Sequence, residues 1–110
     1  MQTGAGDQAM HLIQILLPLY DNRGRRFERS AYAEVQKELS NRFGGLTAFT
    51  RAPAQGLWKN EGDTTYDDIV VLEVMATDLN REWWGQYRST LEALFHQDQV
   101  VIRAQLTELL

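Results

Sequence analysis

The sequence predicts an α+β domain in which two helices cover one face of a four-stranded antiparallel sheet. Two stretches carry apolar residues at helical spacing, and four stretches alternate or run apolar in the manner of strands. These stretches follow one another in the order β-α-β-β-α-β. Right-handed crossovers place both helices of such a chain on the same face of the sheet. The 110 residues suffice for one domain with its own core.

The first strand is expected over residues 11–19, with Pro18 marking its end. The residues before it, 1–10, are mostly small and polar, so we expect a disordered tail there and a single domain over 11–110. The side chains on both faces of this strand are apolar except for the Gln14 amide. One row holds Ile13, Ile15 and Leu17, and the other holds Leu12, Gln14 and Leu16.

The two helices are expected over residues 27–43 and from Asn80 to about residue 95. In the first helix the core-facing side chains recur every four residues: Ala31, Val35, Leu39 and Phe43. The glycines at 44–45 supply the positive φ that ends helices. In the second helix Asn80 is placed to cap the first turn. Leu79 and Trp84 have the spacing of a hydrophobic staple around that cap.

A long hairpin is expected between the helices. Its first strand covers residues 46–50 and is interrupted near Pro53, because proline cannot donate to a strand ladder. Turn residues at 59–63 lead to a strand at 67–76 whose two faces are apolar apart from Glu73, which is typical of a central strand. The last strand is expected over 100–109.

Composition excludes several function classes. A net charge of −4 lacks the basic footprint of a general nucleic-acid binder, and no apolar run approaches the ~20 residues of a membrane span. Because the chain has no cysteine, disulfides, thiolate metal sites and cysteine nucleophiles are excluded. The two histidines, His11 and His96, have no metal-binding spacing. We therefore expect a cytoplasmic, soluble protein without metal, cofactor, nucleic-acid partner or membrane partner.

The element order and face pattern over residues 11–109 resemble the dimeric α/β-barrel branch of the ferredoxin-like superfamily. The run FGGLTAFTRAPAQGLW, residues 43–58, is similar to segments of small uncharacterised bacterial proteins with no established activity. The superfamily resemblance implies a homodimer that packs sheet against sheet. It also implies that a ligand or active site lies in the barrel-like space between the two sheets.

Alternation along the strands leaves a second, largely apolar sheet face that the helices cannot cover. Its expected members are Leu12, Gln14, Leu16, Thr47, Phe49, Arg51, Ile69, Val71, Glu73, Met75, Val101, Arg103 and Gln105. An apolar patch of this size marks an interface, so a second copy of the chain is the expected partner.

The polar members of this second face define a candidate ligand-binding site. We expect Glu73 on a central strand, with Arg51 on the neighbouring strand and Gln14 and Arg103 close by. Trp58, on the hairpin, is placed either to cover the open end of the sheet or to contact the partner subunit. The arginines suit a small anionic or oxygenated ligand, with Glu73 as a weak acid/base candidate. The alternative is a structural ion-pair network between sheet and partner subunit, because such networks gather the same groups.

Two function classes stay open. The first is a non-catalytic homodimer that binds a small ligand or another protein through the second sheet face. The second is a cofactor-independent enzyme of the monooxygenase or isomerase type with its pocket in the barrel, although no histidine falls on the expected pocket face. A haem-binding barrel is disfavoured because neither histidine is placed to ligate iron.

Overall fold

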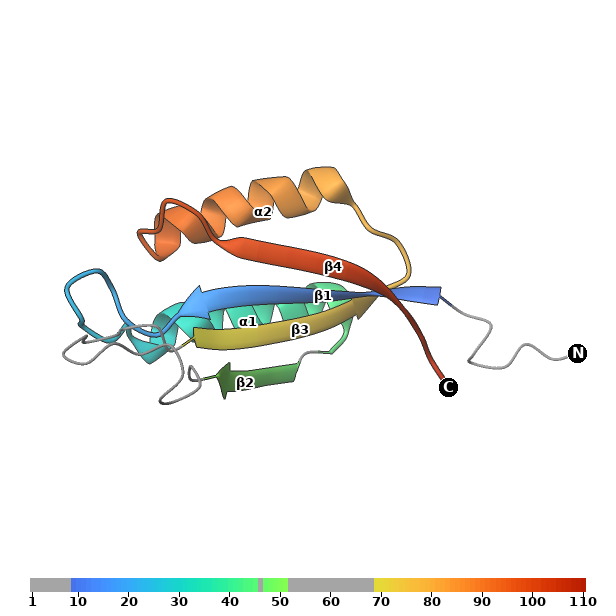
Figure 1. Cartoon of the computed structure of the whole chain (residues 1–110), viewed down its shortest axis with the longest axis horizontal. Coiled ribbons are helices and arrows are strands. Elements are labelled where there is room, and N and C mark those ends of the chain that lie inside the picture. Colours follow the sequence, from blue (N-terminus) through green and yellow to red (C-terminus); the bar gives the residue numbers. More distant parts are fainter. Residues whose placement is uncertain (1–8, 46, 52–68) are drawn as a thin grey trace, which may run out of the picture.

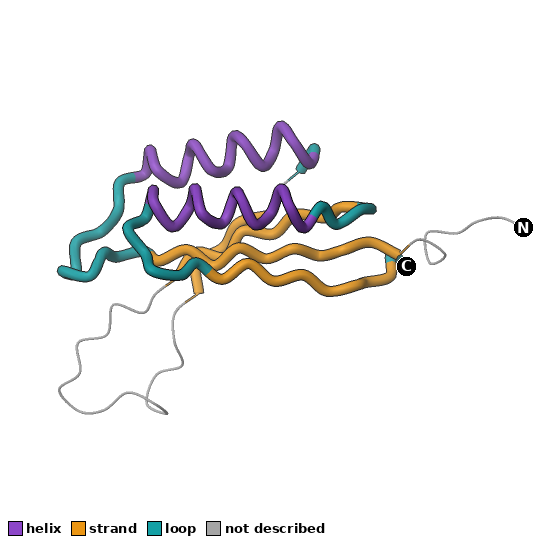
Figure 2. The backbone as a smooth tube through the Cα atoms, turned by 90° about the horizontal axis from the view of Figure 1, so that it is seen from above, coloured by secondary structure: helices purple, strands orange, loops and turns teal. Residues whose placement is uncertain are grey.

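The computed structural model describes residues 9–45, 47–51 and 69–110. These residues form an α+β domain with two helices and an antiparallel sheet, as the sequence predicts. The elements are β1 (Ala9–Pro18), α1 (Arg29–Phe43), β2 (Thr47–Arg51), β3 (Ile69–Ala76), α2 (Arg81–Leu94) and β4 (Val101–Glu108) (Figure 1). The long strands β1, β3 and β4 form the body of the sheet, and the short β2 pairs with β3, giving the order β2-β3-β1-β4. Both helices lie on the same side of the sheet (Figure 2).

The central strand β1 is longer at its start than the sequence indicates. Ala9 and Met10, expected in the disordered tail, pair with Glu108 and Thr107 of β4. Ladder pairing with β4 therefore extends the strand into small and polar sequence. The rest of the expected tail, residues 1–8, lies outside the described residues, as do the expected hairpin turn at 59–63 and the interruption near Pro53.

The core lies between the sheet and the two helices. Its centre is one row of β1, whose side chains Ile13, Ile15 and Leu17 are each 0 % exposed. Around this row pack Val35, Leu39, Leu72, Val74, Trp84, Tyr87, Leu91, Phe95 and Val100. Residues of both helices and of β1 and β3 thus pack into one apolar layer between the helices and the sheet, as the helical and strand periodicities predict.

Helix α1 begins two residues later than expected and ends as expected. Phe27 remains in the connection, where its N–H donates to the Leu19 carbonyl at 3.0 Å. After Phe43 the chain turns at Gly44, whose φ of 78° is the left-handed conformation that glycine adopts without strain. The Gly44 N–H donates to the Ser40 carbonyl at 2.8 Å and satisfies one of the last helical carbonyls.

Helix α2 starts with the predicted cap. The Asn80 side chain accepts a hydrogen bond from the Trp83 N–H at 3.0 Å, which satisfies one of the free donors of the first turn. Leu79 packs against the core cluster that contains Trp84, in agreement with the expected staple. Neither helix, within the described ranges, has the length and hydropathy needed to cross a bilayer. The cytoplasmic location stays a prediction.

An aromatic cluster joins the end of α1 to the start of α2, and Trp83 lies at its centre. The Trp83 ring stacks on Tyr87 with centroids 4.8 Å apart and meets Phe43 edge-on at 5.7 Å. The Arg42 guanidinium lies 4.1 Å from the centroid of the Trp83 ring, within cation–π range. Trp83 therefore packs within the domain, where it holds the two helices together.

Tyr87 makes the domain sensitive to alkali. Burial, followed by the nearby Glu38 carboxylate, raises the pKa of Tyr87 to about 12 from its usual value of 10.0. The folded state thus holds the phenolic proton more tightly than the unfolded chain does. The free energy of unfolding should be constant below about pH 10 and fall by about 2 kcal/mol as the pH rises towards 12.

Urea unfolding at a series of alkaline pH values measures this loss. The Tyr87→Phe variant should show a shallower decline, because it has no proton to lose at this position. Some slope remains, since burial also raises the pKa of Tyr32. Equal slopes in the wild type and the variant would contradict the assignment to Tyr87.

Candidate ligand-binding face of the sheet

The side of the sheet away from the helices, here called the open face, carries the residues that alternation predicts. Register pairs Leu12 with Met75 and Leu16 with Val71 across β1 and β3. It pairs the same two leucines with Gln105 and Val101 across β1 and β4. The other predicted members of this face whose side chains are described are Gln14, Thr47, Ile69, Glu73 and Arg103.

Three polar side chains cross the middle of the open face and form what we call the polar row: Glu73 on β3, Gln14 on β1 and Arg103 on β4. Gln14 is the direct register partner of both others. Its Nε2 donates to Glu73 Oε2 at 2.6 Å, and its Oε1 accepts from Arg103 Nε at 2.8 Å. The carboxylate can only accept and the guanidinium can only donate, so the two ends fix the orientation of the Gln14 amide between them.

The polar row leaves hydrogen-bonding capacity at both ends. Glu73 and Gln14 are half-buried, whereas Arg103 is exposed. Within the described ranges, neither Glu73 Oε1 nor the two terminal nitrogens of Arg103 takes part in a hydrogen bond or ion pair. The row therefore presents a hydrogen-bond acceptor over β3 and a pair of cationic donors over β4. Between them lies the Gln14 amide, which is hydrogen-bonded to both neighbours.

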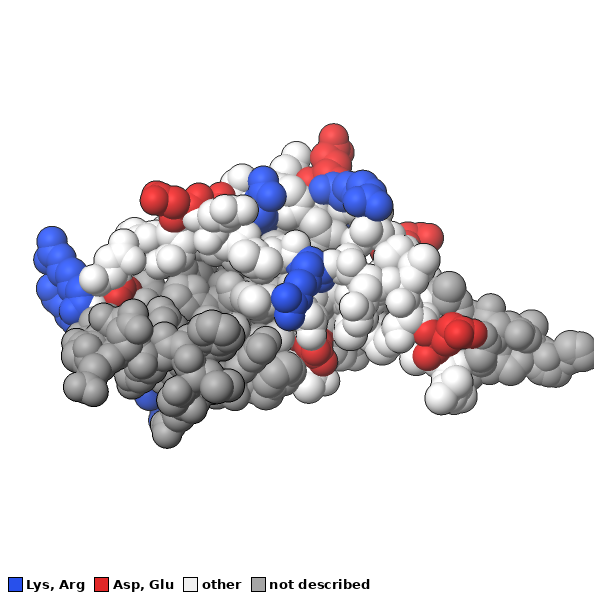
Figure 3. All heavy atoms as spheres, in the orientation of Figure 1, with Lys and Arg blue, Asp and Glu red and all other residues white. Residues whose placement is uncertain are grey.

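The open face is apolar around this row. Val71 is 1 % exposed and Val101 is 45 % exposed, so exposure increases from β3 towards the edge strand β4. Figure 3 shows mainly uncharged atoms over the strands, with one cationic group and one anionic group close together near the middle. A polar row within an apolar surface provides directional contacts in surroundings where water competes less with a ligand.

One of the predicted site residues, Arg51, is not brought into the row by the register of β2. Register places Thr47, not Arg51, opposite Glu73. Arg51 pairs with Ile69, four residues away along β3, which corresponds to about 13 Å of strand. The offset arises because β2 begins at Thr47, which lies opposite Glu73, whereas Arg51 is the last of its five residues. The side chains of Arg51 and Trp58 lie outside the described structure, and their ligand-binding roles stay predictions.

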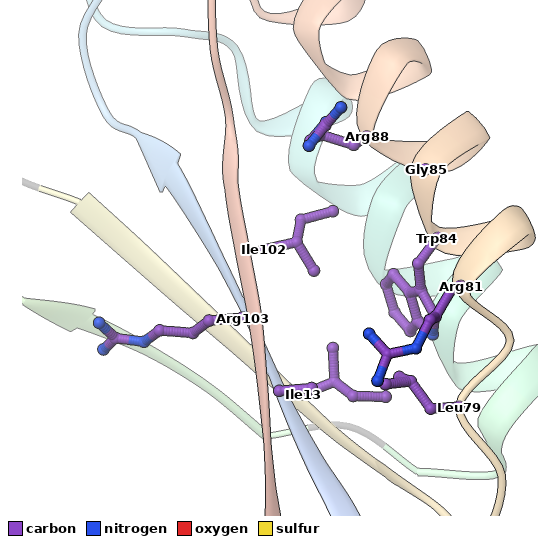
Figure 4. A pocket seen from close by; sticks show the side chains of 9 residues that line it. Ile13, Leu79, Arg81, Trp84, Gly85, Arg88, Ile102 and Arg103 are labelled. Atoms are coloured by element: carbon purple, nitrogen blue, oxygen red, sulfur yellow. The ribbon is translucent and has the colours of Figure 1, made fainter.

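A second candidate site, which the sequence did not indicate, is a cleft on the helix side of the sheet. The cleft has a volume of about 300 Å³ and lies between α2 and β4. Its apolar walls come from Ile13, Leu79, Trp84, Ile102 and Ala104, and Arg81, Gly85 and Arg88 line it from α2. Arg103 contributes only its base, since its side chain points away from the cleft (Figure 4). The feature of the sequence that could have indicated this cleft is the spacing of Arg81 and Arg88 around Gly85 within a helix.

The described residues contain no group of three or more His, Asp or Glu side chains close enough to hold a metal ion. His11 lies in the helix-facing row between Ala76 and Leu106. Its Nδ1 is buried without a hydrogen-bond partner in the described part of the chain. His96 is exposed beyond the end of α2, with a positive φ of 52°. Neither histidine lies on the open face.

No protein-family model and no curated protein sequence matches this chain. Among solved structures, the chain is similar to a phage SAM lyase in complex with S-methyl-5'-thioadenosine, with 12 % sequence identity and a TM-score of 0.52. The alignment covers 99 % of this chain and 95 % of that protein. At this identity the likeness shows the fold alone.

The polar row should be energetically coupled. Replacing Gln14 by Met removes both hydrogen bonds and leaves a half-buried carboxylate without its donor, so it should cost about 2 kcal/mol of the free energy of unfolding. Replacing Gln14 and Glu73 together by Met should cost less than the sum of the single changes, with a coupling of about 1 kcal/mol. Urea unfolding of the four proteins in this cycle measures the coupling.

Gln105 supplies a matched control, because it is an exposed glutamine on the same face opposite Leu12. Gln105→Met should change the free energy of unfolding by less than about 0.5 kcal/mol. Additive costs for the Gln14 and Glu73 changes would show that their hydrogen bond contributes nothing in solution.

Proposed function

We propose that the protein is a homodimeric small-ligand-binding module with the ferredoxin-like architecture. Two open faces pack against each other as a dimeric α/β barrel, and a ligand binds between them at the polar row. The observation that carries this proposal is the row Glu73–Gln14–Arg103, hydrogen-bonded across three strands in the middle of an apolar sheet face that neither of the two described helices covers.

The arrangement of charge on the open face supports a second copy as its partner. Gln14 lies on the middle strand, with an anionic Glu73 on one side and a cationic Arg103 on the other. A two-fold axis passing near Gln14 brings Glu73 of one copy towards Arg103 of the other. Closed dimers use such self-complementary patches, and opposed charges suppress other orientations.

The free groups of the polar row suggest the chemistry of the ligand. Packed sheets lie about 10 Å apart, and polar side chains that face one another across this space leave room for a small molecule. Glu73 accepts a hydrogen bond from a hydroxyl or amino group, and Arg103 binds a carboxylate, a phosphate or another oxygen. The structural neighbour adds S-methyl-5'-thioadenosine as a concrete compound to include in a binding screen.

A cofactor-independent enzyme is the second proposal for the same site. It is supported by the orientation of Glu73, whose Oε2 is held by Gln14 while Oε1 is left for a substrate proton. In this case the Glu73→Gln variant retains ligand binding but loses turnover. In a binding module, wild type and variant both return the ligand unchanged after incubation, as assayed by mass spectrometry.

The dimer is tested by light scattering on a size-exclusion column over a range of protein concentrations. The wild type should elute with the mass of a dimer. Val101→Lys should weaken the dimer at least about tenfold, because it places a charge on the apolar open face. Leu94→Lys is the matched control, since Leu94 is 43 % exposed and Val101 is 45 % exposed but Leu94 lies on α2.

A wild type that stays monomeric at all concentrations would overturn the proposed assembly. Equal weakening by the two lysine substitutions would remove the open face from the interface. A dimer that only Val101→Lys disrupts is the expected result.

Ligand binding at the polar row is tested by calorimetry with S-methyl-5'-thioadenosine and a set of small hydroxy acids. Arg103→Gln should weaken the binding of an acid by about tenfold, because one charge-assisted hydrogen-bond pair is lost. Gln105→Met should leave it unchanged. Equal affinities for the wild type and Arg103→Gln would place the ligand elsewhere.

A further inference from the structure

The cleft between α2 and β4 has the composition of a small-ligand site. Its volume of about 300 Å³ falls at the lower end of small-molecule pockets, which span about 300–1,000 Å³. Trp84 and Ile13 are buried at its floor, and Ile102 and Leu79 complete an apolar surface. In Figure 4 the side chains of Ile13 and Ile102 point from the sheet towards α2.

Gly85 keeps the cleft open at a cost to the helix. It lies in the interior of α2, where glycine disfavours the helix relative to alanine. Packing does not require it, since a Cβ built at this position meets no atom within 4 Å. Across the cleft, β4 presents another small residue, Ala104. The missing side chains are what leaves space over the apolar floor.

Two arginines border this space on the same face of α2. Arg81, Gly85 and Arg88 follow the four- and three-residue spacing of one helical stripe. Arg88 Nε lies 3.7 Å from Glu92 Oε2, and that carboxylate also accepts from the Val100 N–H at 3.0 Å. Arg88 is therefore partly neutralised.

Arg81, unlike Arg88, has no partner among the residues that the structure describes. No hydrogen bond or ion pair joins it to another residue in the ranges that the structure describes. It is the first residue of α2, where the positive end of the helix dipole disfavours a cation and favours an anion. Its guanidinium reaches over the cleft towards Ile13 and Leu79 (Figure 4). An anion seated here satisfies both Arg81 and the helix terminus.

We propose that the cleft between α2 and β4 binds a small aromatic carboxylate, with its ring against Trp84 and Ile102 and its carboxylate on Arg81. Gly85 is required because the ring approaches the helix backbone at that position. This site is separate from the polar row, since the two lie on opposite sides of β4. Only Arg103 belongs to both, with its base in the cleft and its side chain on the open face.

Calorimetric titration of the full chain with naphthoate, and with the neutral naphthylmethanol, tests the proposal. Naphthoate should bind with a dissociation constant in the high-micromolar range, as expected for a ligand of this size. Naphthylmethanol should bind at least about tenfold more weakly, because it lacks the charge that Arg81 recognises. Amide chemical-shift changes should centre on Gly85 and Ala104.

The variants separate binding from folding. Arg81→Gln should weaken naphthoate binding about tenfold. Arg29→Gln should leave it unchanged, and it is a matched control because Arg29 is the first residue of α1 and does not line the cleft. Gly85→Ala should raise the midpoint of thermal unfolding by about 4 °C while weakening binding severalfold. Gly85→Leu should fill the cleft and abolish binding.

Several results would overturn the proposal. The absence of naphthoate binding at millimolar concentration would do so, as would equal effects of Arg81→Gln and Arg29→Gln. A lower unfolding midpoint in Gly85→Ala would show that the glycine serves packing instead. Binding that Glu73→Gln abolishes and Arg81→Gln leaves intact would place the probe on the open face.

Discussion

The structure depends on the alternation of side chains along β1. Successive residues of a strand point to opposite faces, so one layer of helices can bury only every second residue. In β1 the buried row is Ile13, Ile15 and Leu17, and the intervening residues Leu12, Gln14 and Leu16 are left on the other face. The helices therefore complete the core and leave the open face as a second, largely apolar surface.

Much of this division could be predicted from the sequence because it rests on local patterns. Helical spacing, the Asn80 cap and the left-handed turn at Gly44 involve residues close together in the chain, and the structure confirms each of them. The membership of the polar row also followed from alternation. The length of β1 did not, since Ala9 joins the strand by pairing with Glu108, near the other end of the chain. Arg51 lies on the strand next to Glu73, as predicted, but its offset from the polar row could not be predicted, because register between strands depends on pairing and not on composition.

The two candidate sites, the polar row and the cleft, differ in how readily a sequence reveals them. The polar row consists of one amide and two charged residues at strand positions that are otherwise apolar, and such exceptions stand out. The cleft is defined by residues that are small, Gly85 and Ala104, so it becomes apparent only when two elements are placed together. β4 separates the two sites, and it is an edge strand with most of its residues exposed. An edge strand makes fewer contacts than a central strand. β4, which contributes to both sites, is therefore less constrained by the core than β1 is.

The pairing of β1 with β4 also has a consequence for synthesis of the chain. Gln14 and Arg103 are 89 residues apart, yet they are neighbours in the sheet. As the polypeptide leaves the ribosome, β1 can meet α1 and β3 early, but one of its edges has no partner until residues 101–108 have been made. During that interval an apolar strand presents free backbone donors and acceptors, which are the groups that recruit other chains into aggregates. The strand that closes the centre of the sheet is thus translated after the other three, and a nascent chain gains protection at that edge only once β4 has been made.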